Sequence, residues 1–140
     1  MDTRKIAALI SDVRANINRF LIRELNRCGV KGLAPSHGAI LFHLYANEIV
    51  TMKELSTAVR RDKSTVTALV AKLVAGGYIQ KQTSLDDQRK IYIRLTQKGE
   101  QLKPIFEEIS NNLLRRVWKG IDAAEQKEMV RILKKIASNF

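Results

Sequence analysis

A single change of hydrophobic period constrains the fold of this chain more than any other feature. Before Gly76 and again after Thr96, apolar residues recur every three or four positions, which is the spacing of amphipathic helices. Residues 91–95 (IYIRL) instead follow the two-residue period of a half-buried strand. Residues 78–82 are a suitable antiparallel partner, with a polar tip at residues 83–90. The sequence therefore predicts a mostly α fold with one small β-hairpin.

Two helices are expected before the middle of the chain. Gly29 and Gly32 end the first helix, because glycine adopts the left-handed backbone of a helix terminus. Pro35 opens the second as an early helical residue. The apolar stripe of the first helix is Ile6, Leu9, Ile10, Val13, Ile17, Phe20, Leu21 and Leu25, and the buried face of the second is Ile40, Leu41, Leu44 and Tyr45.

A pair of short helices follows, and its start is the sharpest local signal in the chain. Thr51 and Glu54 have the spacing of a capping box, and Val50 and Leu55 that of a hydrophobic staple. A polar link at residues 60–63 leads to the second short helix, which Gly76-Gly77 terminates. The expected inward residues are Leu55, Ala58 and Val59 in the first of these helices and Val66, Leu69, Val70 and Leu73 in the second.

Two helices are expected after the hairpin. Thr96 caps a long helix, and Pro104 inside it predicts a kink. Asp122 and Glu125 repeat the capping pattern before a last helix. The residues expected to face inward from that helix are Met129, Leu133, Ile136 and Phe140.

This order of elements divides the chain loosely into two regions. Residues 36–95 are predicted to form a compact lobe, and residues 1–35 and 96–140 an elongated helical region. A long amphipathic helix needs a partner to cover its apolar stripe. We therefore expect the terminal helices to pack on each other and on the same helices of a second subunit, as the dimerisation region of a homodimer.

The charge balance indicates a polyanionic partner. The chain has 25 Lys and Arg against 14 Asp and Glu, a net charge of +11 and a pI near 10.1. An anionic membrane is the weaker alternative, because the longest apolar stretch, residues 39–45, is far shorter than the roughly 20 residues of a membrane span. The N-terminus lacks the apolar core of a signal peptide, and Cys28 is the single cysteine, so we expect a cytoplasmic protein without disulfides.

Two short helices with a tight turn, followed by a hairpin, have the order of a winged helix-turn-helix. A helix fits the major groove of B-DNA, so the outward face of the second helix is the candidate DNA-reading surface. Its hydroxyl groups suit base edges, its lysines suit phosphates, and no acid follows Asp62 in this helix. The candidate DNA-binding residues on it are Lys63, Ser64, Thr65, Thr67 and Lys72.

The tip of the hairpin adds basic side chains to this surface. Arg89 and Lys90 lie on a polar projection that is suited to a minor groove or to flanking phosphates. Asp86 and Asp87 are their neighbours in sequence. A carboxylate at such a tip is explained if it pairs with Arg89 and orients its guanidinium group.

Residues 87–96 fit the wing pattern D-x-R-x5-L-T, and the chain here resembles the MarR (multiple antibiotic resistance regulator) family. The run 63–67 (KSTVT), Leu73, Gly77 and Lys98-Gly99 look like the recognition helix and following segment of that family. The resemblance implies a homodimer on a pseudo-palindromic operator, with Arg89 at the wing tip and Asp87 as its salt-bridge partner. It also implies a small aromatic or anionic effector bound between the lobes. Ala68 departs from the family pattern, since many members have an arginine there.

Other functions fit the residues less well. An enzyme is not expected, because the chain lacks a nucleophile–His–acid set, a glycine-rich phosphate loop and a His-x-x-x-His pair. A winged helix that binds protein or RNA is the closer rival, although a protein-binding face would be apolar. Redox sensing by Cys28 and metal binding by His37, His43, Glu24 and Cys28 are further alternatives, with a structural role favoured for each.

For Tyr45 and Trp118, a role in packing is favoured over a role in the walls of an effector pocket. The arginines Arg14, Arg19 and Arg23 are expected to form a solvated basic face. The resulting prediction is a sequence-specific regulator of transcription that binds double-stranded DNA without cofactor or metal. It represses by occupying a promoter and is released by its effector.

Overall fold

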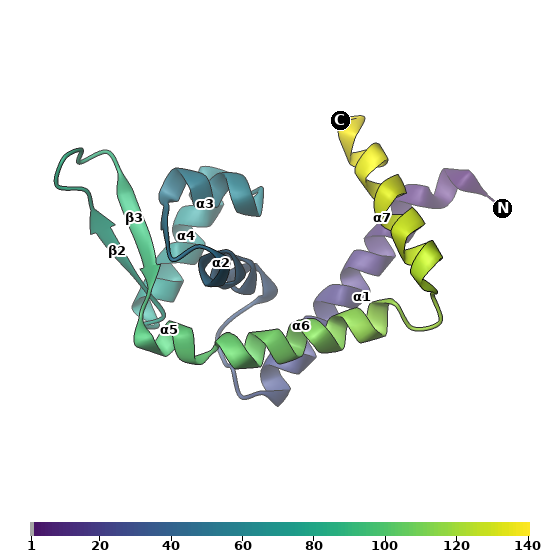
Figure 1. Ribbon diagram of the computed structural model, residues 1–140, viewed down its shortest axis with the longest axis horizontal. Coiled ribbons are helices and arrows are strands. Elements are labelled where there is room, and N and C mark those ends of the chain that lie inside the picture. Colours follow the sequence, from purple (N-terminus) through teal and green to yellow (C-terminus); the bar gives the residue numbers. More distant parts are fainter. Residues whose placement is uncertain (1) are drawn as a thin grey trace.

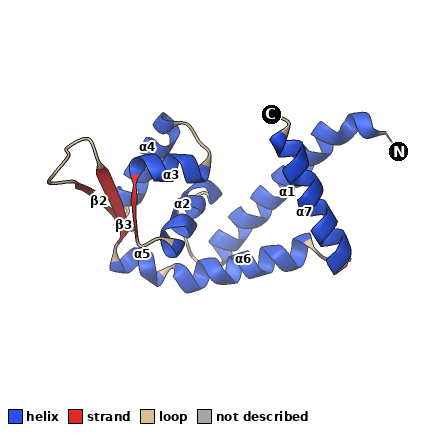
Figure 2. Cartoon of the chain, turned by 45° about the horizontal axis from the view of Figure 1, so that its top comes forward, coloured by secondary structure: helices blue, strands red, loops and turns tan. Residues whose placement is uncertain are grey.

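The computed structural model describes residues 2–140, which form a compact lobe and an elongated helical part (Figure 1). The lobe contains α2 (Pro35–Ala46), α3 (Met52–Val59), α4 (Lys63–Ala75) and a small sheet. The helical part contains η1 (Thr3–Lys5), α1 (Ile6–Arg27), α6 (Lys103–Val117) and α7 (Ala123–Ser138). Figure 2 shows α6 running from the lobe to α7. The predicted mostly α fold with a small wing is confirmed.

The sheet has three antiparallel strands, β1 (Ile49–Thr51), β2 (Ile79–Thr83) and β3 (Ile91–Leu95), in the order β1-β3-β2. The predicted hairpin is confirmed, with Ile79 opposite Leu95, so its first strand begins one residue later than expected. Strand β1 was not predicted. It has three residues and pairs Val50 with Ile93, a contact that no local periodicity can reveal.

The predicted helix starts are formed by side-chain caps. Thr51 Oγ1 accepts from the amide of Glu54 at 3.1 Å, and Glu54 Oε2 accepts from the amide of Thr51 at 3.0 Å. Asp122 Oδ1 accepts from the amide of Glu125 at 2.8 Å, and Glu125 Oε1 accepts in return at 3.2 Å. Both capping boxes are confirmed, and each satisfies two backbone donors that a helix start leaves free.

The helix after the wing is not one kinked helix. It is split into α5 (Gln97–Gln101) and α6, which meet at Leu102. Pro104 lies in the first turn of α6, where its missing amide hydrogen is not needed for a helical hydrogen bond. The expected kink is therefore a break, and the proline starts a helix instead of bending one.

The buried core lies mainly in the lobe and extends along the α1–α6 contact. It consists of Leu25, Val30, Ile40, Leu41, Leu44, Val50, Leu55, Val66, Val70, Leu73, Ile79, Ile93, Phe106 and Ile109. Four residues expected on buried faces of the lobe differ, because Ala58 is exposed and Tyr45, Val59 and Leu69 are only half-buried. The rings of Phe42 and Tyr45 on α2 pack on Phe106 with centroids 5.8 and 6.2 Å away, which joins the lobe to α6.

A polar cluster fixes α1 against α6. Glu24 Oε2 lies 2.6 Å from Arg27 Nε, and Glu24 Oε1 accepts from Asn112 Nδ2 at 2.8 Å. Arg27 also reaches Glu108 at 3.0 Å. The hydrogen bond from Arg27, followed by that from Asn112, lowers the pKa of Glu24. These contacts hold the crossing of the two helices near the C-terminal end of α1.

Helix α7 has no buried residue, so the prediction that its apolar side chains face inward is wrong within one subunit. Met129, Leu133 and Phe140 are exposed, and Ile136 is half-buried. The N-terminal half of α1 is similar: Ile6, Leu9, Ile10 and Val13 are exposed by 42 to 56%. The far end of the helical part thus presents two apolar faces that this subunit leaves uncovered.

Candidate nucleic-acid interface

The start of α4 is ordered by Asp62. Its Oδ1 accepts from the amide of Thr65 at 3.3 Å, and its Oδ2 accepts from Ser64 Oγ at 2.8 Å. The hydrogen bonds with Thr65 and Ser64 lower the pKa of this carboxyl group. Thr67 Oγ1 donates to the carbonyl of Lys63 at 2.8 Å. The hydroxyl groups of Ser64 and Thr67 are therefore held in place by the N-cap and the first turn of the helix itself.

The two faces of α4 differ sharply. Val66, Val70 and Leu73 are buried against the lobe. The other face exposes Lys63, Ser64, Thr67, Ala68 and Lys72, while Thr65 is half-buried. The two lysines are nine positions apart, which is roughly 14 Å along a helix. The structure thus brings together on one surface the residues that the sequence pattern selected on this helix, with Thr65 at its edge.

The wing projects from the lobe on the side away from α1 and α7 (Figure 1). Asp87 Oδ1 accepts from the amide of Arg89 at 3.0 Å and lies 3.5 Å from Arg89 Nε. The carbonyl of Asp87 accepts from the amide of Lys90 at 3.0 Å. The Arg89 side chain is 95% exposed, and Lys90 is also exposed. Asp87 therefore organises the tip, and both basic side chains extend into solvent.

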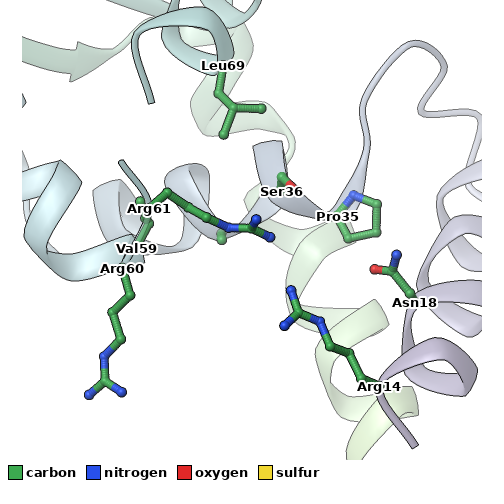
Figure 3. A pocket seen from close by; sticks show the side chains of 9 residues that line it. Arg14, Asn18, Pro35, Ser36, Val59, Arg60, Arg61 and Leu69 are labelled. Carbon is green, nitrogen blue, oxygen red and sulfur yellow. The ribbon is translucent and has the colours of Figure 1, made fainter. Parts of the chain in front are cut away.

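Sequence reasoning missed a basic cavity between the two parts of the molecule (Figure 3). Its volume is about 420 Å³. Its walls come from α1, the start of α2, the end of α3, the turn after it, and α4. The lining residues are Arg14, Asn18, Pro35, Ser36, Ala39, Val59, Arg60, Arg61 and Leu69.

Figure 3 shows Arg14 and Arg61 extending into the same space, whereas Arg60 points away. Within residues 2–140, neither Arg14 nor Arg61 has a carboxylate within ion-pair distance. The adjacent arginines were visible in the sequence, but their convergence with Arg14 depends on the tertiary fold.

Two of the remaining candidate residues have hydrogen-bond partners within the fold. His37 is buried, and its Nδ1 accepts from the amide of Ala34 at 2.9 Å; burial lowers its pKa, and the charge of Lys72 lowers it further. Tyr45 donates to the carbonyl of Gly99 at 2.8 Å, and burial raises its pKa to about 12. Cys28 and Trp118 are half-buried.

Residues 2–140 lack the features that two of the alternatives would need. No three His, Cys, Asp or Glu side chains gather there closely enough to hold a metal ion. Nor does any helix in that range combine the length and apolar character that crossing a membrane requires.

Comparison with known proteins identifies the family. The sequence profile of the MarR family matches residues 31–90. The HTH-type transcriptional regulator SarZ of Staphylococcus haemolyticus is 30% identical over 102 residues, which cover 71% of this chain and 67% of that protein. The chain belongs to the MarR family. The transcriptional repressor MprA of Escherichia coli is 25% identical over 94 residues, covering 67% of this chain and 53% of the repressor. This MarR-family chain thus matches between about half and two thirds of the length of these relatives.

Solved structures of MarR-family proteins share the whole fold. A MarR transcriptional regulator from Methanosarcina mazei superposes with a TM-score of 0.83 at 23% identity, covering 98% of this chain and 96% of the other. The MepR–DNA complex from S. aureus superposes with a TM-score of 0.87 at 21% identity, covering 96% of this chain and 97% of the MepR chain. An E. coli MarR variant complexed with operator DNA has a TM-score of 0.81 at 21% identity, covering 97% of this chain and 99% of the variant. The arrangement of lobe, wing and terminal helices is therefore that of the MarR fold.

Proposed function

We propose that this MarR-family regulator binds double-stranded DNA sequence-specifically through α4 and the wing. The observation that carries the proposal is the exposed outer face of α4, which is polar, basic and free of acids from Lys63 to Lys72. A protein-binding helix of this kind would present apolar side chains instead, which disfavours the rival function. The DNA complexes formed by MepR and MarR, two proteins of the same fold, support the assignment.

Each residue of the proposed interface has a role that follows from its chemistry. Ser64, Thr65 and Thr67 supply short hydroxyl groups for base edges in the major groove. The lysines of α4 neutralise phosphates, which fixes the position of the helix without reading sequence. Arg89 and Lys90 reach the adjacent minor groove or its phosphates from the wing. Ala68 contributes no polar contact, so the readout depends on its hydroxyl neighbours.

Substitution of Thr67 and Arg89 tests this assignment. We expect Thr67→Ala and Arg89→Ala each to weaken binding to an operator selected from random duplexes, by about 1–3 kcal/mol for a lost base contact. Arg4→Ala is the matched control, because Arg4 is 94% exposed and lies 3.4 Å from Asp2, much like the Arg89–Asp87 pair. Equal operator affinity of all three variants and the wild type would show that the interface is assigned wrongly.

Salt dependence provides a second measurement. Because each phosphate contact releases condensed counterions, the affinity of the wild type should fall steeply with salt. The Arg89→Ala variant should show a shallower slope by about one unit if Arg89 contacts a phosphate. An unchanged slope together with reduced affinity indicates a base contact in the minor groove.

We further propose that the functional unit is a homodimer formed by the helical part, residues 1–35 and 96–140, with the lobe at 36–95 as the DNA-binding region. The exposed apolar side chains of α1 and α7 support this, since such a face is stable in water only when covered. A two-fold dimer places its two α4 helices on half-sites about 34 Å apart. Such a dimer represses transcription by covering the promoter.

The cavity beside α1 is the proposed effector site. Two guanidinium groups that no carboxylate of residues 2–140 pairs with converge there beside Val59 and Leu69, an arrangement suited to a small aromatic or aliphatic carboxylate. Its position between α1 and the turn before α4 allows a ligand to change the spacing of the DNA-reading helices. We expect benzoate to raise the melting temperature of the wild type and to weaken operator binding. Arg61→Gln should lose both effects, whereas Arg19→Gln, outside the cavity, should keep them.

A further inference from the structure

Lys98 makes contacts that the proposed interface does not use. It lies in α5, directly after the wing, and its side chain reaches back to the end of α4. Its Nζ donates to the carbonyl of Gly76 at 2.7 Å and lies 4.5 Å from the centroid of the Tyr78 ring. Gly76 is the C-cap of α4, so the ammonium group satisfies a terminal carbonyl at the negative end of that helix.

Thr96 and Gly99 join the same two segments. Thr96 Oγ1 donates to the carbonyl of Gly77 at 2.5 Å, and the amide of Thr96 donates to the carbonyl of Tyr78 at 3.0 Å. A Cβ atom on Gly99 would lie 2.1 Å from the carbonyl oxygen of Tyr78, so the two backbones are in direct contact. We call the contacts of residues 96–99 with residues 76–78 the wing-base clamp.

The wing-base clamp connects the chain leaving α4 to the chain leaving the wing. Residues 76–78 follow the last turn of α4 and precede β2, whereas residues 96–99 follow β3. Lys98 itself contacts the C-cap of α4, roughly 6 Å along the helix axis beyond Lys72, where the proposed contact surface ends. Its side chain is committed to Gly76 and Tyr78, so it acts on the two reading elements and not on the duplex.

We propose that Lys98 is a positioning residue, which through the wing-base clamp holds α4 and the wing as one rigid body for simultaneous entry into neighbouring grooves. This inference rests on the proposed DNA-binding function. When two DNA-contacting elements belong to one rigid body, the second contact with DNA forms without a separate entropic cost. If the clamp loosens, the wing loses its fixed orientation relative to α4, and the contribution of Arg89 falls although Arg89 itself is unchanged.

A double-mutant cycle tests the positioning role. We expect Lys98→Met, which keeps the aliphatic stem, to weaken binding to the selected operator on the order of tenfold, because the contact of Arg89 with DNA that it positions contributes about that much. In the Arg89→Ala background the same change should have almost no effect, because no wing contact is left to position. Lys98→Arg should restore affinity, since a guanidinium group can also donate to Gly76 and stack on Tyr78. Equal losses in the two backgrounds would mean that Lys98 contacts phosphate directly, and the proposal would be wrong.

A measurement without DNA separates this inference from the proposed function. Spin labels at Ala71→Cys and Gln82→Cys, both exposed, report the distance between α4 and the wing in a Cys28→Ser background. We expect a narrow distance distribution for the wild-type clamp and for Lys98→Arg, and a broader one for Lys98→Met, which should still unfold in one cooperative transition. Identical distributions for all three would overturn the clamp. A narrow wild-type distribution that broadens in Lys98→Met, in a protein that binds no duplex, would refute the DNA proposal alone.

Discussion

Truncation of Leu133 to alanine measures directly whether α7 is a subunit interface. Leu133 is 44% exposed in the isolated subunit, so a partner that covers it removes less than half of its side chain from water. The substitution deletes three carbon atoms, each worth about 0.8 kcal/mol when fully buried. Scaled by the exposed fraction, the loss is about 1 kcal/mol per subunit. A two-fold interface contains the residue twice, so the dimer should weaken by about 2 kcal/mol, or about 30-fold in dissociation constant.

Sedimentation velocity over a concentration series measures this shift. Leu85→Ala is the matched control, because Leu85 is 98% exposed but lies at the tip of the wing, far from α7. We expect the control to keep the dissociation constant of the wild type. Alanine is a good helix former, so the isolated α7 should not unravel in the Leu133 variant. If Leu133→Ala dimerises as tightly as the control, the uncovered face of α7 is not the dimer interface and the area argument fails.

Two further substitutions test the packing and the pH response of the fold. Gly99→Ala places a Cβ atom 2.1 Å from the carbonyl oxygen of Tyr78. Because the backbone can shift only slightly to relieve this clash, we expect the free energy of unfolding, measured in urea, to fall by about 3 kcal/mol. Gly38→Ala should cost less, since its Cβ would meet only a ring carbon of Phe106 at 3.1 Å; equal costs would contradict this. His37 is buried as the neutral acceptor for the amide of Ala34, with a pKa below its ordinary value of 6.5. Its contribution to stability is therefore complete above about pH 6.5 and declines as the pH falls through the lowered pKa. His37→Gln keeps an acceptor at this position, so its unfolding free energy should fall less than that of the wild type between pH 7 and 5.

Local sequence signals were sufficient wherever a structure depends on neighbours in the chain. The capping boxes at Thr51 and Asp122 depend on contacts three residues apart. The hairpin at residues 79–95 follows from a short-range change of period and one polar tip. The outer face of α4 follows from the helical spacing of Val66, Val70 and Leu73, which places the remaining side chains outward. These features made the candidate DNA surface predictable from composition and spacing.

Features built from distant segments required the tertiary structure. Residues 49–51 of β1 pair with residues 92–94 of β3, which lie far away in the sequence, and three residues are too few to show a period. Arg14 and Arg61 converge from two separate elements. The hydrogen bond from Lys98 to Gly76 likewise joins two elements that are distant in the sequence. The uncovered face of α7 is also a tertiary result. Periodicity identifies which side of a helix is apolar, but only the packing of the chain decides whether that side is buried within the subunit or left for a partner.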